Sequence, residues 1–131
     1  MPNIQYEDKA PIDIRKYEAK HGKQLPTPAG YHLLIALPEV KEKTDGGIII
    51  PEERRDAESA ASIVGYVLDM GPDCYLDKSK FPSGPWCKRK DWILMSAYAG
   101  TRLKIWDKEF RIINDDSVEG VIENPSGVAR V

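Results

Sequence analysis

Short apolar runs separated by turn signals constrain this chain most. Six of them have strand length, and each is followed within two residues by glycine, proline, asparagine or aspartate: residues 31–37, 63–70, 92–98, 101–106, 110–113 and 118–123. Short runs rich in β-branched and aromatic side chains are typical of strands, whereas helices need longer periodic segments. Because the six runs follow one another closely, with no convincing helix among them, they predict a small all-β barrel or sandwich.

The first run, residues 31–37, is apolar on both faces apart from His32. A strand that is covered on one face only would alternate with polar residues. We therefore expect its own core to cover one face and another subunit to cover the other. Pro38 ends the run at strand length, which favours a strand over a buried helix segment.

The chain divides into an extension and one domain. Its 131 residues suit a single domain with some length left over. Residues 1–25 are polar, with a short helix expected over residues 13–20 and Gly22 as its stop. The domain covers residues 26–131, and within it residues 73–91 form a long connection that contains Pro82, Gly84 and Pro85.

Composition argues against several classes of partner. The net charge of -2 gives no attraction to nucleic acid or to an anionic membrane. No apolar stretch approaches the roughly 18 residues of a membrane span, and residues 1–9 lack a signal-peptide layout, so we expect a cytoplasmic protein. Cys74 and Cys87 are too few for a disulfide framework. We expect free thiols, with a cross-strand bridge as the alternative.

The sequence offers no catalytic or metal-binding pattern. The residues that could bind zinc are Cys74, Cys87, His21 and His32, and none of them forms the closely spaced pairs that are typical of zinc sites. His32 lies within an apolar strand and is expected to be structural. No Gly-x-Ser-x-Gly motif is present, and no Lys-Ser/Thr follows the glycine pair to form a phosphate cradle. Asp115 and Asp116 are expected in a capped turn. We therefore expect no catalytic residue, no metal and no cofactor.

A charged, turn-rich segment, residues 38–62, contains one apolar island, Gly46-Gly47-Ile48-Ile49-Ile50-Pro51. Flanks this polar cannot build a core, so we expect a solvated loop. Burying one isoleucine gains about 1.5–3 kcal/mol, and the triplet has no local place to bury. The pattern therefore favours docking into a groove on another protein. The alternative is a short strand packed on this protein's own sheet.

These motifs, in this order, resemble the GroES-type co-chaperonins, the ring-shaped lids of the bacterial folding chamber. The resemblance covers about residues 26–123. It rests on five ordered pieces: a first strand at 26–40, a mobile-loop motif at 45–51, a strand ending in Gly-Pro at 64–72, an Asp-to-Gly-Thr block at 91–101, and a closing pair of strands at 110–123. Any one piece would mean little, but all five in order form a specific signal.

The resemblance implies a GroES-like β-barrel with a mobile loop over residues 39–62 and a roof connection over residues 73–91. Family members form a heptameric homo-oligomer in which the first strand of one subunit pairs with the last strand of its neighbour. The interface side chains would be Leu33, Ile35, Leu37, Val118, Val121 and Ile122. Tyr98 and Trp86 would face the cavity or the roof.

The resemblance also implies the partners. A GroEL-type chaperonin would bind the loop through Gly46, Gly47, Ile48, Ile49 and Ile50. Unfolded substrate proteins would occupy the closed chamber, and the chaperonin, not this chain, would bind ATP.

Several features depart from the family pattern. Lys90 stands where glycine usually precedes the Asp, which implies a turn built differently, and Asp107-Lys108 replaces Asn-Gly in a hairpin. The loop is longer, by residues 54–62, and the extension before Leu25 has no counterpart. This enlarged form resembles the co-chaperonins carried by bacteriophages. Two rivals remain: a ring-forming structural protein (virion or scaffold) without a chaperonin, and an accessory domain like the similar barrel of alcohol dehydrogenases.

Overall fold

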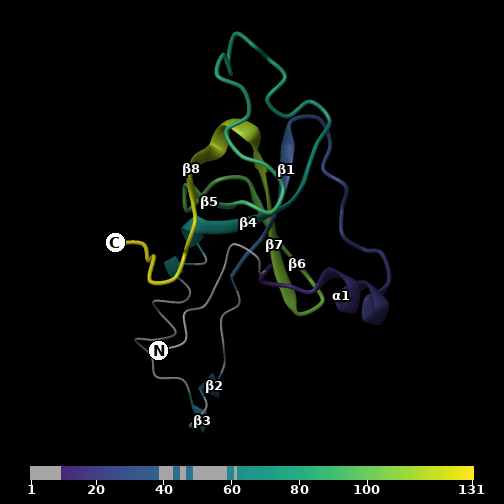
Figure 1. Cartoon of the computed structure of the whole chain (residues 1–131). Coiled ribbons are helices and arrows are strands. Elements are labelled where there is room, and N and C mark those ends of the chain that lie inside the picture. The colour runs from purple at the N-terminus through teal and green to yellow at the C-terminus, as the bar shows by residue number, and fades with distance from the viewer. Residues whose placement is uncertain (1–9, 39–42, 45–46, 49–58, 61) are drawn as a thin grey trace.

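The computed structural model describes residues 10–38, 43–44, 47–48, 59–60 and 62–131 (Figure 1). All six predicted strands are present, and the prediction of an all-β fold is confirmed. The described elements are α1 (Ile14–His21), β1 (His32–Ala36), β2 (Lys43–Thr44), β3 (Gly47–Ile48), β4 (Val64–Met70), β5 (Trp92–Met95), β6 (Thr101–Ile105), β7 (Lys108–Asn114), the 3-10 turn η1 (Asp115–Ser117) and β8 (Val118–Ile122).

Six strands form one antiparallel sheet in the order β6-β7-β1-β4-β5-β8. Strands that are not neighbours in this order still share one buried cluster, which joins Leu33 of β1 to Ile93 of β5 and Val118 of β8. The sheet therefore curls around a common interior, as a small barrel does. Alternate residues of the same strands point to a second cluster on the opposite face.

Strand β1 lies in the middle of the sheet, and both of its edges are already paired. Leu34 is opposite Asp69 of β4 on one side and Ile112 of β7 on the other. The prediction that this strand pairs with the last strand of a neighbouring subunit is therefore wrong, because no free edge remains.

The second face of β1 is covered by the N-terminal extension and not by another subunit. Leu34 and Ala36 belong to the second cluster, together with Ile12 and Tyr17. The Tyr17 hydroxyl donates a hydrogen bond to the backbone carbonyl of Ile105 in β6. The apolar character of both faces was correctly recognised, but its cause lies within the chain.

Helix α1 forms where the sequence predicted it. Asp13 caps its N-terminus by accepting a hydrogen bond from the Lys16 amide at 3.3 Å. Gly22 ends it with φ 81°, and its amide donates to the Glu18 carbonyl at 2.7 Å. His21, the last residue of the helix, stacks on Trp106 with ring centroids 4.9 Å apart. These contacts fasten the extension to the β6–β7 hairpin (Figure 1).

Three backbone positions correct the sequence interpretation. Lys90 adopts φ 76°, so the turn keeps a left-handed residue without glycine. The hairpin turn is made by Trp106 and Asp107, between β6 and β7, with φ 55° at Trp106. Gly65 lies within β4 and pairs regularly with Ile93 of β5. A Cβ at Gly65 would lie 2.1 Å from the Ile35 Cγ2 atom, so close packing requires glycine there.

Candidate functional site

The segment that carries the isoleucine triplet leaves the barrel between β1 and β4. Within it, β2 and β3 pair antiparallel, with Lys43 opposite Ile48 and Thr44 opposite Gly47. Figure 1 places this pair at the end of the molecule opposite the roof connection. Of the predicted binding residues, Gly47 and Ile48 thus belong to β3, whereas Gly46, Ile49 and Ile50 lie outside the described residues.

The chain returns to the barrel through a short root, which we define as residues 59, 60, 62 and 63. Their backbone is helical, and the Ser62 hydroxyl donates to the Ser59 carbonyl at 2.7 Å. Arg111 of β7 reaches the same point from inside the barrel. Its Nη1 donates to the carbonyls of Ser62, at 3.1 Å, and Ser96, at 3.2 Å.

Arg111 is an unusual residue for this position because only 1% of it is exposed. Its Nε finds no hydrogen-bond acceptor among the residues that the structure describes. Burial, with a smaller contribution from Arg102, lowers the pKa of the Arg111 guanidinium. A buried cation is costly, so its two carbonyl contacts identify a specific anchoring role.

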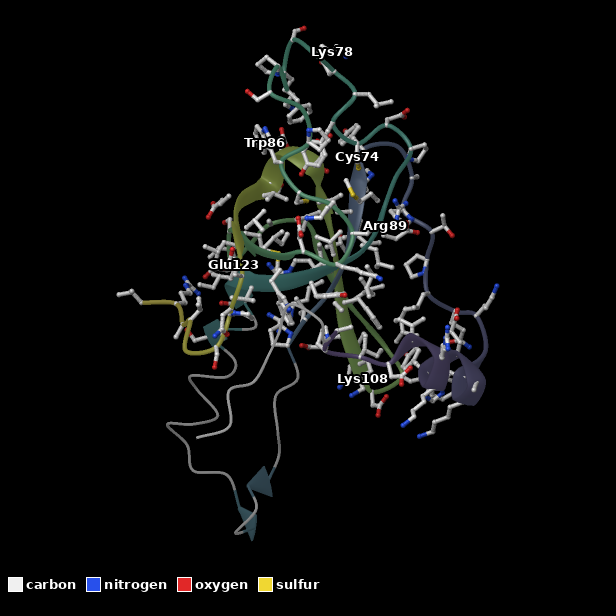
Figure 2. The ribbon with its side chains drawn as sticks, in the orientation of Figure 1. Cys74, Lys78, Trp86, Arg89, Lys108 and Glu123 are labelled. Atoms are coloured by element: carbon white, nitrogen blue, oxygen red, sulfur yellow. The ribbon has the colours of Figure 1, made fainter. Side chains whose placement is uncertain are left out.

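The roof connection, residues 73–91, is organised around Tyr75. The Tyr75 ring meets Phe81 edge to face, with centroids 4.9 Å apart, and Trp86 packs on Phe81 at 5.0 Å. The Tyr75 amide donates to Asp115 Oδ2 at 3.0 Å, and its hydroxyl donates to the Asp115 carbonyl at 2.8 Å. Figure 2 shows Lys78 at the tip of this connection and Cys74 and Trp86 closer to the barrel.

Both cysteines are free and buried at the two ends of the roof connection. The Cys74 thiol lies 3.3 Å from the His32 carbonyl and can donate to it. Burial raises the pKa of Cys74 to about 11 and also raises the pKa of Cys87. Neither thiol is therefore an activated nucleophile at neutral pH.

The predicted interface residues separate into two groups. Leu33, Ile35, Leu37 and Val118 are buried in the barrel of their own chain, so their assignment to a subunit interface is wrong. Val121 is 49% exposed, and Ile122 is half-buried in the second cluster. Both belong to β8, which is an edge strand of the sheet.

The two predicted cavity or roof residues occupy different places. Trp86 is part of the roof cluster and is partly exposed. Tyr98 lies in the turn after β5 and is 84% exposed, with the Arg130 guanidinium 5.4 Å from its ring centroid. The structure therefore does not bring Trp86 and Tyr98 together in one contact.

Sequence reasoning missed Arg111 and the partner of Asp115. Asp115 lies in a turn before β8, as predicted, but its side chain is buried and accepts a hydrogen bond from the Tyr75 amide instead of capping that turn. Arg111 is the one charged residue in the apolar run 110–113, and its side chain points to the face opposite that of Phe110. A charge at an inward position of a strand was the available signal.

The described residues contain no group of three or more His, Cys, Asp or Glu side chains that could hold a metal ion. Within the same part of the chain, no helix has both the length and the apolar character that a membrane crossing requires.

Known proteins match most of this chain. The family model described as Chaperonin 10 Kd subunit matches residues 26–122. The Co-chaperonin GroES of Caldicellulosiruptor saccharolyticus is 33% identical over 97 residues, which are 74% of this chain and 96% of that relative. The Co-chaperonin GroES of Methylacidiphilum infernorum is 32% identical over 96 residues, covering 73% and 92% respectively. The chain therefore belongs to the chaperonin 10 kDa subunit family, the family of the GroES co-chaperonins.

Proposed function

We propose that this chain forms a ring that caps an ATP-bound GroEL-type chaperonin and encloses substrate protein for folding. The observation that carries the proposal is the match over residues 26–122, which includes the isoleucine segment (Gly46 to Ile50) and the strands on both sides of it. The relatives bear the name co-chaperonin. The chain itself performs no chemistry in this proposal, and the partner binds and hydrolyses ATP.

The isoleucine segment docks into an apolar groove of the chaperonin. Burying each isoleucine contributes about 1.5–3 kcal/mol, whereas ordering each loop residue costs about 1–2 kcal/mol. The two terms nearly cancel, so a single loop binds weakly. Several loops on one ring act together, and their high effective concentration gives firm but reversible capture. A lid that must leave in every cycle needs this balance.

The ring contains seven copies in this proposal, and it works in the cytoplasm of a bacterial host. The edge strand β8 supports assembly, because pairing with an extended segment of a neighbouring copy would remove its open edge. Exposed Val121 lies on that strand. The N-terminal helix, outside the matched residues, supports a bacteriophage-encoded member with added segments.

Replacing Ile49 with aspartate tests the function. A charge in an apolar groove is costly, so Ile49→Asp should leave the ring intact and reduce chaperonin binding at least about 100-fold. ATP-dependent co-sedimentation with a bacterial chaperonin measures binding, and native mass spectrometry measures the ring. The matched control is Leu76→Asp, which adds the same charge at an exposed apolar residue of the roof.

Unchanged binding of Ile49→Asp would remove the segment from the mechanism. No binding by the wild-type ring would contradict the proposal and favour the ring-forming structural protein. A refolding assay with the same chaperonin then reports whether capture leads to productive folding.

A further inference from the structure

The C-terminal tail, residues 124–131, lies beyond the matched residues 26–122, yet it is fastened to the barrel. Pro125 is buried, and the Val128 amide donates to its carbonyl at 3.1 Å. The Val128 side chain packs against the second core cluster. A segment outside the sheet usually frays unless specific contacts hold it, and these contacts hold residues 125–128 on the barrel.

The end of this tail binds the root of the loop. The Ser59 hydroxyl donates to the Arg130 carbonyl at 3.0 Å, and the Arg130 amide donates to the Ser59 hydroxyl oxygen at 2.9 Å. The Arg130 guanidinium lies over the Tyr98 ring, which fixes the tail on the barrel side. Figure 1 shows the yellow tail beside the teal segment that leads into β4.

Arg111 of β7 also holds the root, by donating a hydrogen bond to the Ser62 carbonyl at 3.1 Å. Its other contact, to the Ser96 carbonyl, ties the root to the end of β5. Ser59 and Ser62 are themselves linked by the hydrogen bond from the Ser62 hydroxyl. The root is thus held by two arginine residues that are distant in sequence and approach from different elements.

We propose that the tail and Arg111 form a clamp that ends the loop at Ser59 and thereby sets the strength of chaperonin binding. The inference rests on the proposed function. If the clamp opens, the free segment lengthens beyond Ser59 and docking must order more residues. Every copy in the ring carries the same clamp, so a small penalty per copy multiplies across the ring. Ser59, Arg111 and Arg130 are positioning residues in this proposal, because they act through the loop they hold.

The test uses the full-length ring and variants of Ser59. Ser59→Ala removes both hydrogen bonds to Arg130. Ser59→Thr keeps the hydroxyl and should therefore retain both hydrogen bonds and wild-type chaperonin binding. The control is Ser79→Ala, which removes a serine hydroxyl bonded to Asp77 in the roof. Truncation after Gly127 removes Arg130 and with it both hydrogen bonds to Ser59. Arg111→Met removes the hydrogen bond to the Ser62 carbonyl, and its control is Arg102→Met on the neighbouring strand.

Two measurements are made on every variant. Amide hydrogen exchange of residues 62–64, without chaperonin, should accelerate about tenfold in Ser59→Ala and in the truncated chain. Affinity of the ring for the ATP-bound chaperonin should fall at least about tenfold in the same variants and recover in Ser59→Thr. The roof control should change neither quantity. A thermal melt and a native mass spectrum confirm that each variant keeps its fold and ring.

Unchanged exchange in Ser59→Ala and in the truncated chain would overturn the clamp. Faster exchange with unchanged or tighter chaperonin binding would overturn its effect on affinity. If the wild-type ring binds no chaperonin, the proposed function fails. The exchange measurement still decides whether the tail holds the root, so the two failures are distinguishable.

Discussion

The roof connection and the loop segment are two long excursions from the same barrel, and they differ in what their sequences can bury. Residues 73–91 contain three aromatic residues, whereas residues 39–62 contain none. In the roof, Tyr75, Phe81 and Trp86 pack on one another, and Asp115 binds Tyr75 from η1. The described part of the loop is held at its root by Arg111 and Arg130, which belong to other segments.

A long connection forms its own structure when it carries side chains large enough to build a small core. Aromatic residues bury a large area with few rotatable bonds, so a cluster of three offsets much of the ordering entropy. The loop segment has no aromatic residue, and its largest apolar side chains are Ile48, Ile49 and Ile50, which lie between charged residues in the sequence. It therefore lacks a comparable set of side chains for a small core of its own.

Phe81→Ala should have the largest effect on stability, because it removes the centre of the aromatic cluster that holds the roof connection. Phe81 is buried beneath Trp86 and beside Tyr75, so its removal should lower the free energy of unfolding by about 3–5 kcal/mol. Urea denaturation of the protein measures the loss. Leu76→Ala, at a residue that is 63% exposed, is the control and should cost far less. A loss below about 1 kcal/mol for Phe81→Ala would mean that the cluster does not hold the roof.

The pH dependence of the free energy of unfolding tests the burial of Cys74 at the start of the roof connection. The pKa of Cys74 is raised from 9.0 to about 11 by burial, so the unfolded chain loses this proton first. Stability should therefore be fully present below pH 9 and should fall between pH 9 and 11. Denaturation at several pH values measures this slope, and Cys74→Ala should have a shallower one. Equal slopes in the two proteins would contradict the assigned burial.

Lys90→Gly probes the end of the roof and should have the smallest effect. Lys90 has φ 76°, a conformation that strains most residues by about 1–2 kcal/mol. Glycine removes the strain but adds freedom to the unfolded chain, so we expect a gain of up to about 1 kcal/mol in the free energy of unfolding. Chemical denaturation measures it. Lys88→Gly, where φ is not positive, should destabilise instead, and the same sign for both variants would refute the explanation.

The sequence predicted the strands well because each apolar run carries its own local signals. Helix α1 was also predictable, since Asp13 and Gly22 cap it as their residue types suggest. Local signals could not say what covers the second face of β1, because Ile12 and Tyr17 come from a distant and largely polar segment. The same limit hid the carbonyl contacts of Arg111 and the binding of Tyr75 by Asp115, which depend on how separate strands and turns meet.

In the proposed function, the isoleucine segment becomes buried only when a chaperonin binds it. Amide hydrogen exchange at Ile48, Ile49 and Ile50, compared between the free ring and the ring bound to an ATP-loaded chaperonin, tests this most directly. We expect fast exchange in the free ring and protection of at least about 100-fold in the complex. Equal protection in both states would show that the triplet is already packed within its own assembly, and the docking proposal would then be wrong.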